Sequence, residues 1–259
     1  MQDKVVMITG STSGVGLGIA RNFAKQKAIL CINGFTTTNT ILEIQAELKN
    51  LGAKEVFYHP ADMSKPETIS DMFDQIMKKF GKVEVLINNA GIQFVSPIEQ
   101  FPPEKWEQII RIDLIASFYT IRQVLPSMKK NGWGRIINIA SAHALVASPF
   151  KSAYVAAKHG MLGMTKTVAL EVAEEGITVN AICPGYVKTP LVLNQVADTA
   201  KIRGLSEEEV IKKVILGAQA TKKFVEIDEV AALVLFLCGD QATSITGAAL
   251  SIDGGWTAQ

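Results

Sequence analysis

The chain has 259 residues, of which 48% are hydrophobic and 20% charged, and this composition suits one globular domain. Its 26 basic and 25 acidic residues leave a net charge of +1, which does not favour nucleic acid as a partner. The longest apolar run, 230–238, is too short to span a membrane, and the first ten residues lack the apolar stretch of a signal peptide. Cys31, Cys183 and Cys238 are widely separated in apolar stretches. We therefore expect buried free thiols, no membrane contact and a cytoplasmic location.

Short β-rich runs alternate with helical patterns along the chain. Most of these runs are apolar throughout, which is typical of strands covered on both faces of a parallel sheet. The repeated order of strand and helix predicts an α/β fold, a doubly wound (Rossmann-like) parallel seven-stranded sheet with helices on both faces. The predicted strands are residues 4–9, 28–33, 55–60, 83–88, 134–140, 177–182 and 247–253, and the clearest predicted helices are 16–26 and 104–130.

One region breaks this alternation. Residues 189–217 have a helical pattern and lie between the sixth and seventh predicted strands. Insertions of this length near a ligand site often act as lids. We therefore expect a substrate lid at about 189–217 within a single dinucleotide-binding and catalytic domain, residues 1–259.

A glycine-rich loop directly follows the first predicted strand and opens the first predicted helix. Gly10, Gly14 and Gly16 would let the backbone approach a pyrophosphate, and the start of the helix would offer it free N–H groups. The alternative is a glycine turn that serves only the packing of strand against helix. The strand before and the helix after the loop favour a dinucleotide site.

The spacing Thr9-Gly10-x-x-x-Gly14-x-Gly16 resembles that of the short-chain dehydrogenase/reductase family. Three further motifs extend the resemblance over nearly the whole chain: "NNAG" at 88–91, Ser141 with Tyr154-x-x-x-Lys158, and "PGYVKT" at 184–189. The resemblance implies hydride transfer between a nicotinamide and a carbonyl or alcohol carbon. The cofactor-binding positions that it implies are Gly10, Thr12, Ser13, Gly14, Val15, Gly16, Phe35, Asp62, Met63, Asn89, Gly91, Tyr154, Lys158, Pro184, Gly185, Val187 and Thr189.

The resemblance also implies a catalytic set. Tyr154 would exchange a proton with the substrate oxygen, Ser141 would hydrogen-bond that oxygen, and Lys158 would lower the pKa of the phenol and hold the nicotinamide ribose. A free tyrosine has a pKa of about 10, and a nearby ammonium group favours the phenolate. Asp113 stands where the family usually has an asparagine. Its carboxylate would either accept a hydrogen bond from the water of a proton relay or be a buried acid with a shifted pKa.

The end of the second predicted strand bears on the choice of nicotinamide cofactor. No Arg or Lys occurs between Cys31 and Lys49, so a 2′-phosphate would find no counter-charge in this segment. We therefore predict NAD. Phe35 is interpreted as a wall for the adenosine, or alternatively as an aromatic residue unrelated to the cofactor, and Asp62 is expected at the adenine edge, as in similar proteins.

Further polar side chains are expected to face the same cavity. Lys151 precedes Tyr154 by one helical turn, and His143 follows Ser141 by two residues. A cation with several neutral hydrogen-bonding groups suits a small anionic hydroxy or keto acid. Taken alone, Lys151 has the plainer interpretation of a snorkelling surface lysine, and His143 that of a structural histidine. The predicted substrate-binding set is Gln93, Ser141, His143, Lys151, Tyr154, Gln195 and Trp256.

The same stretches resemble a subgroup of the family that interconverts (R)-3-hydroxybutyrate and acetoacetate with NAD. The matching segments are Asn33–Phe35, "HALVASPFKSAY", "PGYVKTPLV", "QATKKFV" at 219–225 and "DGGWTAQ". The resemblance implies that Gln93, His143, Lys151 and Gln195 bind the substrate carboxylate and that Trp256 helps to shape the site. It also implies a homo-oligomer, commonly a tetramer, and we expect no metal in the site. The alternatives are a 3-oxoacyl thioester reductase, another small-ketone reductase of the family, and a non-catalytic NAD-binding regulator.

Overall fold

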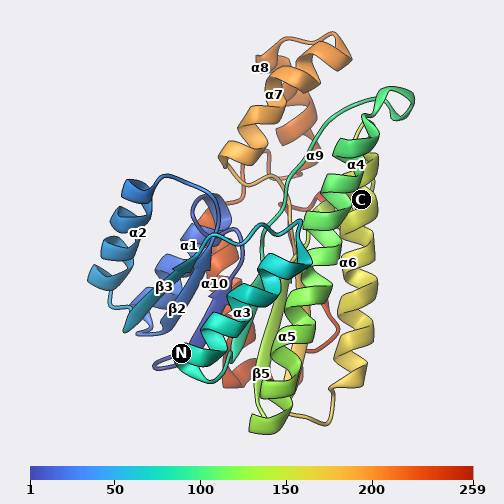
Figure 1. Cartoon of the computed structure of the whole chain (residues 1–259). Helices are drawn as coiled ribbons and strands as arrows, with labels where there is room; N and C mark the ends of the chain where they lie inside the picture. The colour runs from blue at the N-terminus through green and yellow to red at the C-terminus, as the bar shows by residue number, and fades with distance from the viewer. Residues whose placement is uncertain (259) are drawn as a thin grey trace.

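Seven parallel strands form one sheet in the computed structural model, which describes residues 1–258 (Figure 1). The strand order is β3-β2-β1-β4-β5-β6-β7, so the order reverses between β1 and β4. Ligands of doubly wound sheets bind at this point, beyond the carboxyl ends of the strands. The predicted fold and its seven strands are confirmed. The strands are β1 (Val5–Ile8), β2 (Ile29–Asn33), β3 (Glu55–His59), β4 (Val85–Asn88), β5 (Gly134–Ile139), β6 (Ile177–Pro184) and β7 (Ala249–Ile252).

Helices cover both faces of the sheet. Alternate residues of β1 point to opposite faces, so Val6 and Ile8 belong to one apolar cluster and Val5 and Met7 to another. The first cluster includes side chains of α1 (Gly14–Lys25), α2 (Thr38–Asn50) and α10 (Ile227–Cys238), and the second those of α3 (Pro66–Phe80), α5 (Ala116–Asn131) and α6 (Ser152–Glu171). Burial of each large apolar side chain contributes about 1.5–3 kcal/mol, which explains why the strands are apolar throughout.

The predicted helix 104–130 is a continuous helical stretch with a π-helical turn inside it. It comprises α4 (Pro103–Ile110), the π turn η2 (Arg111–Ile115) and α5. A π turn inserts one extra residue into the helical repeat, and such turns are frequent at functional sites. Asp113 lies in this turn and is completely buried.

A helical segment projects beyond the carboxyl ends of the strands (Figure 1). This projecting segment, residues 190–218, contains α7 (Pro190–Arg203), α8 (Glu207–Glu209), the π turn η4 (Val210–Ile215) and α9 (Leu216–Ala218). It has its own apolar cluster, which includes Tyr186 and Val210. The stretches that precede and follow this segment lie side by side, because the backbone N–H of Val225 donates to the carbonyl oxygen of Tyr186 at 2.9 Å.

Four short 3-10 helices complete the elements: η1 (Ile98–Gln100), η3 (Ala142–Ala144), η5 (Asp240–Ala242) and η6 (Trp256–Ala258). Cys31, Cys183 and Cys238 are buried and unpaired, as predicted. Within residues 1–258, no helix combines the length and apolar character needed to cross a bilayer.

Candidate active site

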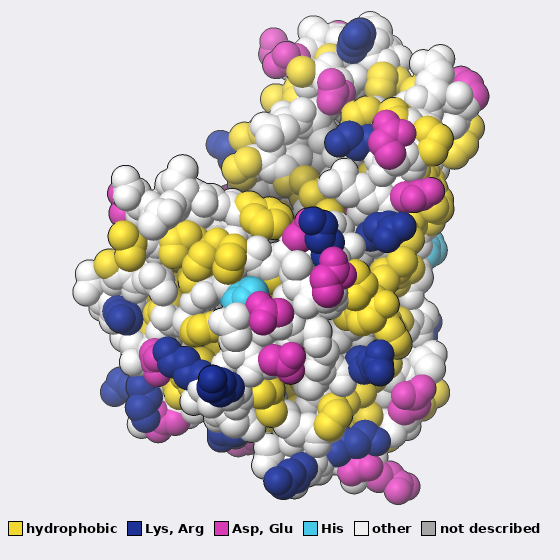
Figure 2. All heavy atoms as spheres, in the orientation of Figure 1, with side chains coloured by type: hydrophobic (Ala, Val, Ile, Leu, Met, Phe, Trp, Pro, Cys, Tyr) yellow, Lys and Arg dark blue, Asp and Glu magenta, His cyan; other side chains and the backbone are white. Residues whose placement is uncertain are grey.

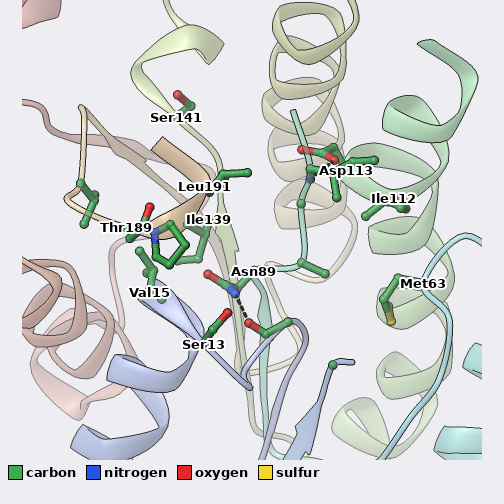
Figure 3. A pocket seen from close by; sticks show the side chains of 18 of the residues that line it. Ser13, Val15, Met63, Asn89, Ile112, Asp113, Ile139, Ser141, Thr189 and Leu191 are labelled. Atoms are coloured by element: carbon green, nitrogen blue, oxygen red, sulfur yellow. Dashed lines mark hydrogen bonds between the residues drawn. The ribbon is translucent and has the colours of Figure 1, made fainter. Parts of the chain in front are cut away.

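The glycine loop and the loop after β4 are held against each other. Gly10 and Gly14 have φ values of +61° and +53°, which favour glycine, and a Cβ at Gly10 would lie 2.8 Å from the Cα of Ala90. Asn89 Nδ2 donates to the carbonyl oxygens of Thr9 (3.0 Å) and Gly10 (2.9 Å), and Figure 3 shows the Asn89 side chain turned toward the glycine loop. The sequence therefore builds one rigid edge of a cavity from two loops.

A cavity of about 390 Å³ opens where these loops meet the start of α1. Ser13, the N-cap residue of α1, makes no side-chain hydrogen bond to the helix, so the first-turn N–H groups are available to a phosphate. The cavity is lined by sixteen of the seventeen predicted cofactor positions: Gly10, Thr12, Ser13, Gly14, Val15, Phe35, Asp62, Met63, Asn89, Gly91, Tyr154, Lys158, Pro184, Gly185, Val187 and Thr189. The glycine loop and the uncapped N-terminus of α1 fit the pyrophosphate of a dinucleotide. The cofactor-binding roles of the individual residues stay predictions.

Gly16 is the exception among the predicted cofactor positions, because it does not line the cavity. A Cβ at this position would clash with the carbonyl oxygen of Gly10 and lie 2.5 Å from Asn89 Nδ2. This glycine therefore serves the close packing of α1 against the loop. The alternative interpretation of the glycine pattern was a turn that serves only the packing of strand against helix. At Gly16 the structure supports such a packing role.

Asn33 ends β2 and has its side chain turned to the backbone. Its Oδ1 accepts from the N–H of Gly10 at 3.3 Å, and its Nδ2 donates to the carbonyl oxygens of His59 (3.1 Å) and Ala61 (2.9 Å). The neighbouring Phe35 lines the cavity and is 69% exposed, so it is not a core residue. Within the described chain, the only cation that lines this cavity is Lys158.

Ser141, Tyr154, Lys158 and Asp113 all line the same cavity, on the side away from the glycine loop. Lys158 Nζ donates to the carbonyl oxygen of Ile139 at 3.0 Å and lies 3.6 Å from Asp113 Oδ2. The same ammonium lies 5.4 Å from the centre of the Tyr154 ring. Asp113 Oδ1 accepts from the backbone N–H of Ile92 at 2.9 Å. The predicted catalytic residues are thus brought together, and their catalytic roles stay predictions.

Burial determines the direction of the pKa shifts of Asp113 and Tyr154. Burial raises the pKa of Asp113 to about 6, although the charge of Lys158 opposes the shift. Burial also raises the pKa of Tyr154 above its ordinary value, and the charge of Asp113 adds to the increase while a hydrogen bond with Ser141 opposes it. Burial is the largest cause of the raised pKa of Tyr154 in the protein by itself. The role of Lys158 in lowering that pKa during the reaction stays a prediction, and its ammonium lies 3.6 Å from Asp113 Oδ2.

Asp113 is a buried acid with a raised pKa, and its Oδ2 atom makes no hydrogen bond to a described residue. The raised pKa agrees with the second interpretation of Asp113, and its part in a proton relay stays a prediction. Burial also lowers the pKa of Lys158, and the nearby carboxylate opposes that shift. Each partner thus favours the charged state of the other, while the surroundings favour the neutral state of both.

Lys151 is buried, so its interpretation as a surface lysine is wrong. It is the N-cap residue of α6, and its Nζ donates to the hydroxyl of Tyr186 and to Oε1 of Gln195, both at 3.3 Å. Both partners are neutral, and no carboxylate of residues 1–258 lies within 4.0 Å of this ammonium. Burial, with a smaller effect from the charge of Arg203, lowers the pKa of Lys151 to about 7.

A second cavity, of about 320 Å³, lies between Lys151 and the projecting segment. Figure 2 shows the molecule hollowed between this segment and the rest of the chain. Gln195 and Trp256 line the cavity as well, so three of the predicted substrate-binding residues meet there. Tyr186 also lines it, although it is not among the predicted substrate-binding residues. Its ring stacks on that of Trp256, with centres 5.2 Å apart.

His143 lies beside this group but lines neither of the two cavities. Its Nδ1 is 3.4 Å from the hydroxyl of Ser141, its Nε2 is 2.9 Å from that of Ser148, and its ring meets the Trp256 ring edge-on at 4.8 Å. Burial lowers the pKa of His143 to about 3, and the charge of Lys151 adds to the shift, so the imidazole is neutral at pH 7. Gln93 lines neither cavity, and its buried Nε2 has no partner in the described structure.

The chain is similar to known proteins over nearly its whole length. A family model described as enoyl-(acyl carrier protein) reductase matches residues 10–257. The chain is 58% identical over 256 residues to D-beta-hydroxybutyrate dehydrogenase of Rhizobium meliloti (strain 1021), with 99% of each chain covered. It is 49% identical over 260 residues to the protein of the same name from Cupriavidus necator, with 100% of each covered. A solved variant of actinorhodin polyketide ketoreductase with NADPH superposes with a TM-score of 0.93 at 32% identity, with 100% of each chain covered.

These matches extend over nearly the full length of the chain, which therefore belongs to the short-chain dehydrogenase/reductase family. The protein is accordingly an oxidoreductase that depends on a nicotinamide dinucleotide. The resemblance drawn from the four sequence motifs is confirmed.

Proposed function

We propose that this enzyme interconverts (R)-3-hydroxybutyrate and acetoacetate with NAD(H). The observation that carries the proposal is Lys151, a buried ammonium whose protein partners are both neutral. Burying a charge without an ionic partner is costly, so the site favours a ligand that supplies the negative charge. The two relatives named D-beta-hydroxybutyrate dehydrogenase support the identity of the acid.

The remaining residues then take complementary roles. Bound NAD(H) supplies hydride chemistry at the carbon that bears the substrate oxygen. Tyr154 donates a proton to that oxygen during reduction and accepts it during oxidation, while Ser141 hydrogen-bonds the same oxygen. Lys158 stays oriented through the Ile139 carbonyl and Asp113. Lys151 and Gln195 bind the carboxylate, and Trp256 with Tyr186 provides an apolar wall.

We propose NAD over NADP because the glycine-loop end of the cavity offers no cation within residues 1–258. A 2′-phosphate bound at this end would meet no lining cation that balances its charge, which is unfavourable. The projecting segment is proposed as the lid, since it contributes Gln195 to the substrate side. The homo-oligomer and the cytoplasmic location stay predictions.

A 3-oxoacyl thioester reductase is the second candidate, and a 3-oxoacyl-(acyl carrier protein) reductase of Thermotoga maritima that is 31% identical over 255 residues supports it. A thioester carries no charge at the position of the carboxylate, however, and would leave Lys151 without a counter-ion. The charged acid is therefore the better fit.

The test is the absorbance of NADH during incubation with NAD and each enantiomer of 3-hydroxybutyrate. We expect NADH formation with the R enantiomer and little with the S enantiomer or with NADP. A parallel assay compares the reduction of free acetoacetate with that of its thioester. Faster reduction of the thioester, or a requirement for NADPH, would replace this proposal with the second candidate.

A further inference from the structure

The cavity beneath the projecting segment contains more positive charge than one carboxylate can balance. Lys151 lies on its inner wall, and Arg203 and Lys213 line it from the projecting segment, whereas neither Asp nor Glu lines it within the described residues. Lys213 is balanced locally, because its Nζ lies 2.7 Å from Oε1 of Glu209. Lys151 and Arg203 are thus the two cations of this cavity without a carboxylate partner in residues 1–258.

Phe150, which precedes Lys151 and also lines the cavity, has an unusual backbone conformation. Phe150 has a φ of +71°, which is rare for a bulky residue, and its carbonyl oxygen accepts from the backbone N–H of Ser96 at 2.9 Å. The guanidinium of Arg203 lies 5.7 Å from the centre of the Phe150 ring. Arg203 therefore lies against Phe150, the residue that precedes Lys151. Arg203 and Lys151 line the same cavity.

We propose that this cavity contains a second anion subsite at Arg203, so that the protein binds short dicarboxylates with one carboxylate at Lys151 and the other at Arg203. The inference rests on the proposed role of Lys151 as the partner of a substrate carboxylate. Arg203 is exposed, so water solvates its guanidinium when a monocarboxylate binds at Lys151. A dicarboxylate would add a second, charge-assisted pair of hydrogen bonds at this guanidinium.

The size of the cavity limits the size of the ligand. A volume of about 320 Å³ has room for a chain of four or five carbons with a carboxylate at each end. Glutarate is the probe of choice, and butyrate is the matched acid with one charge. Arg203 also lies at the C-terminal end of α7, so a ligand that bridges the two cations links the projecting segment to the start of α6.

The test is isothermal titration calorimetry of the full-length protein saturated with NADH, with glutarate and with butyrate. We expect glutarate to bind at least tenfold more tightly than butyrate. Arg203→Gln is expected to reduce this ratio to threefold or less, and Arg203→Lys to retain most of it. The control is Lys201→Gln, an exposed lysine on the same helix that does not line the cavity and is expected to keep the full ratio. Circular dichroism of each variant verifies folding.

Glutarate affinity no higher than that of butyrate in the unaltered protein would overturn the inference, as would an unchanged ratio in Arg203→Gln. Oxidation of (R)-3-hydroxybutyrate is measured on the same preparation, which separates the two proposals. Oxidation without a glutarate advantage refutes the subsite alone. A glutarate advantage that depends on Arg203, without oxidation of the hydroxy acid, supports the subsite and refutes the proposed substrate.

Discussion

The burial of Lys151 predicts a specific pH dependence of substrate affinity. Its pKa is lowered to about 7, so the group is charged below pH 7 and loses its charge as the pH rises. If only the charged form binds the carboxylate, the competent fraction is about 0.9 at pH 6 and about 0.09 at pH 8, and the apparent affinity falls by the same factor. The KM for acetoacetate is therefore expected to rise about tenfold between pH 6 and pH 8.

The assay is the initial rate of NADH oxidation at saturating NADH, with acetoacetate varied at each half unit from pH 6 to pH 9. The matched variant is Lys151→Met, which keeps the length of the side chain without its charge. At pH 6 this variant is expected to raise KM by about 30-fold or more, because removal of one partner of a buried charge pair costs at least about 2 kcal/mol. Its KM is expected to be nearly constant with pH.

Two outcomes would refute this reasoning. A KM that is flat from pH 6 to pH 9 in the unaltered enzyme would mean that Lys151 does not provide the charge. A pH dependence retained in Lys151→Met would assign the titration to another group. Asp113, with a pKa of about 6, contacts Lys158 and is expected to act on kcat instead.

Three further predictions concern catalysis and folding. Tyr154→Phe is expected to lower kcat by about 100- to 10,000-fold in steady-state assays. Its affinity for NADH, measured by fluorescence titration, is expected to change by less than about twofold. A loss of NADH binding would contradict a purely chemical role of Tyr154. Asp113→Asn removes a charge that raises the pKa of Tyr154. The acid limb of the pH profile of kcat for oxidation is therefore expected to move to lower pH, with activity retained. Complete inactivation would contradict this prediction. Gly16→Ala is expected to lower the free energy of unfolding by about 1–3 kcal/mol in urea titrations, because the added Cβ meets the Gly10 carbonyl. Gly163→Ala, at an exposed position of α6 with nothing within 4 Å, is expected to raise it by about 0.5–1 kcal/mol, and similar effects at the two sites would contradict the packing argument.

The fold could be predicted from the sequence because its determinants are local. Apolar runs bounded by turn residues marked all seven strands, and the glycine loop marked the start of α1. The π turn at 111–115 could not be predicted, because a one-residue insertion leaves the apolar pattern of a helix nearly unchanged. This turn nevertheless places Asp113 inside the cavity.

The parts of the site that were missed depend on contacts between distant segments. The sequence places Lys158 one helical turn after Tyr154 but does not reveal that Asp113, on another helix, offsets the ammonium. The sequence also does not reveal that Lys151 donates a hydrogen bond to the hydroxyl of Tyr186, or that Arg203 lies against the ring of Phe150. The only sequence signal for a role of Arg203 was its position in the predicted substrate lid, residues 189–217. At Gly16 the structure adds a packing role, because a Cβ there would clash with the Gly10 carbonyl oxygen, and its contact with the cofactor stays a prediction.

The most direct test of the central claim, that a buried ammonium selects a small hydroxy acid, is a comparison of (R)-3-hydroxybutyrate with its uncharged methyl ester. The measured quantity is kcat/KM for NADH formation at pH 6.5, in the unaltered enzyme and in Lys151→Met. We expect the unaltered enzyme to prefer the acid by about 30-fold or more, and the variant to lose most of this preference. Equal oxidation of acid and ester by the unaltered enzyme would contradict the account.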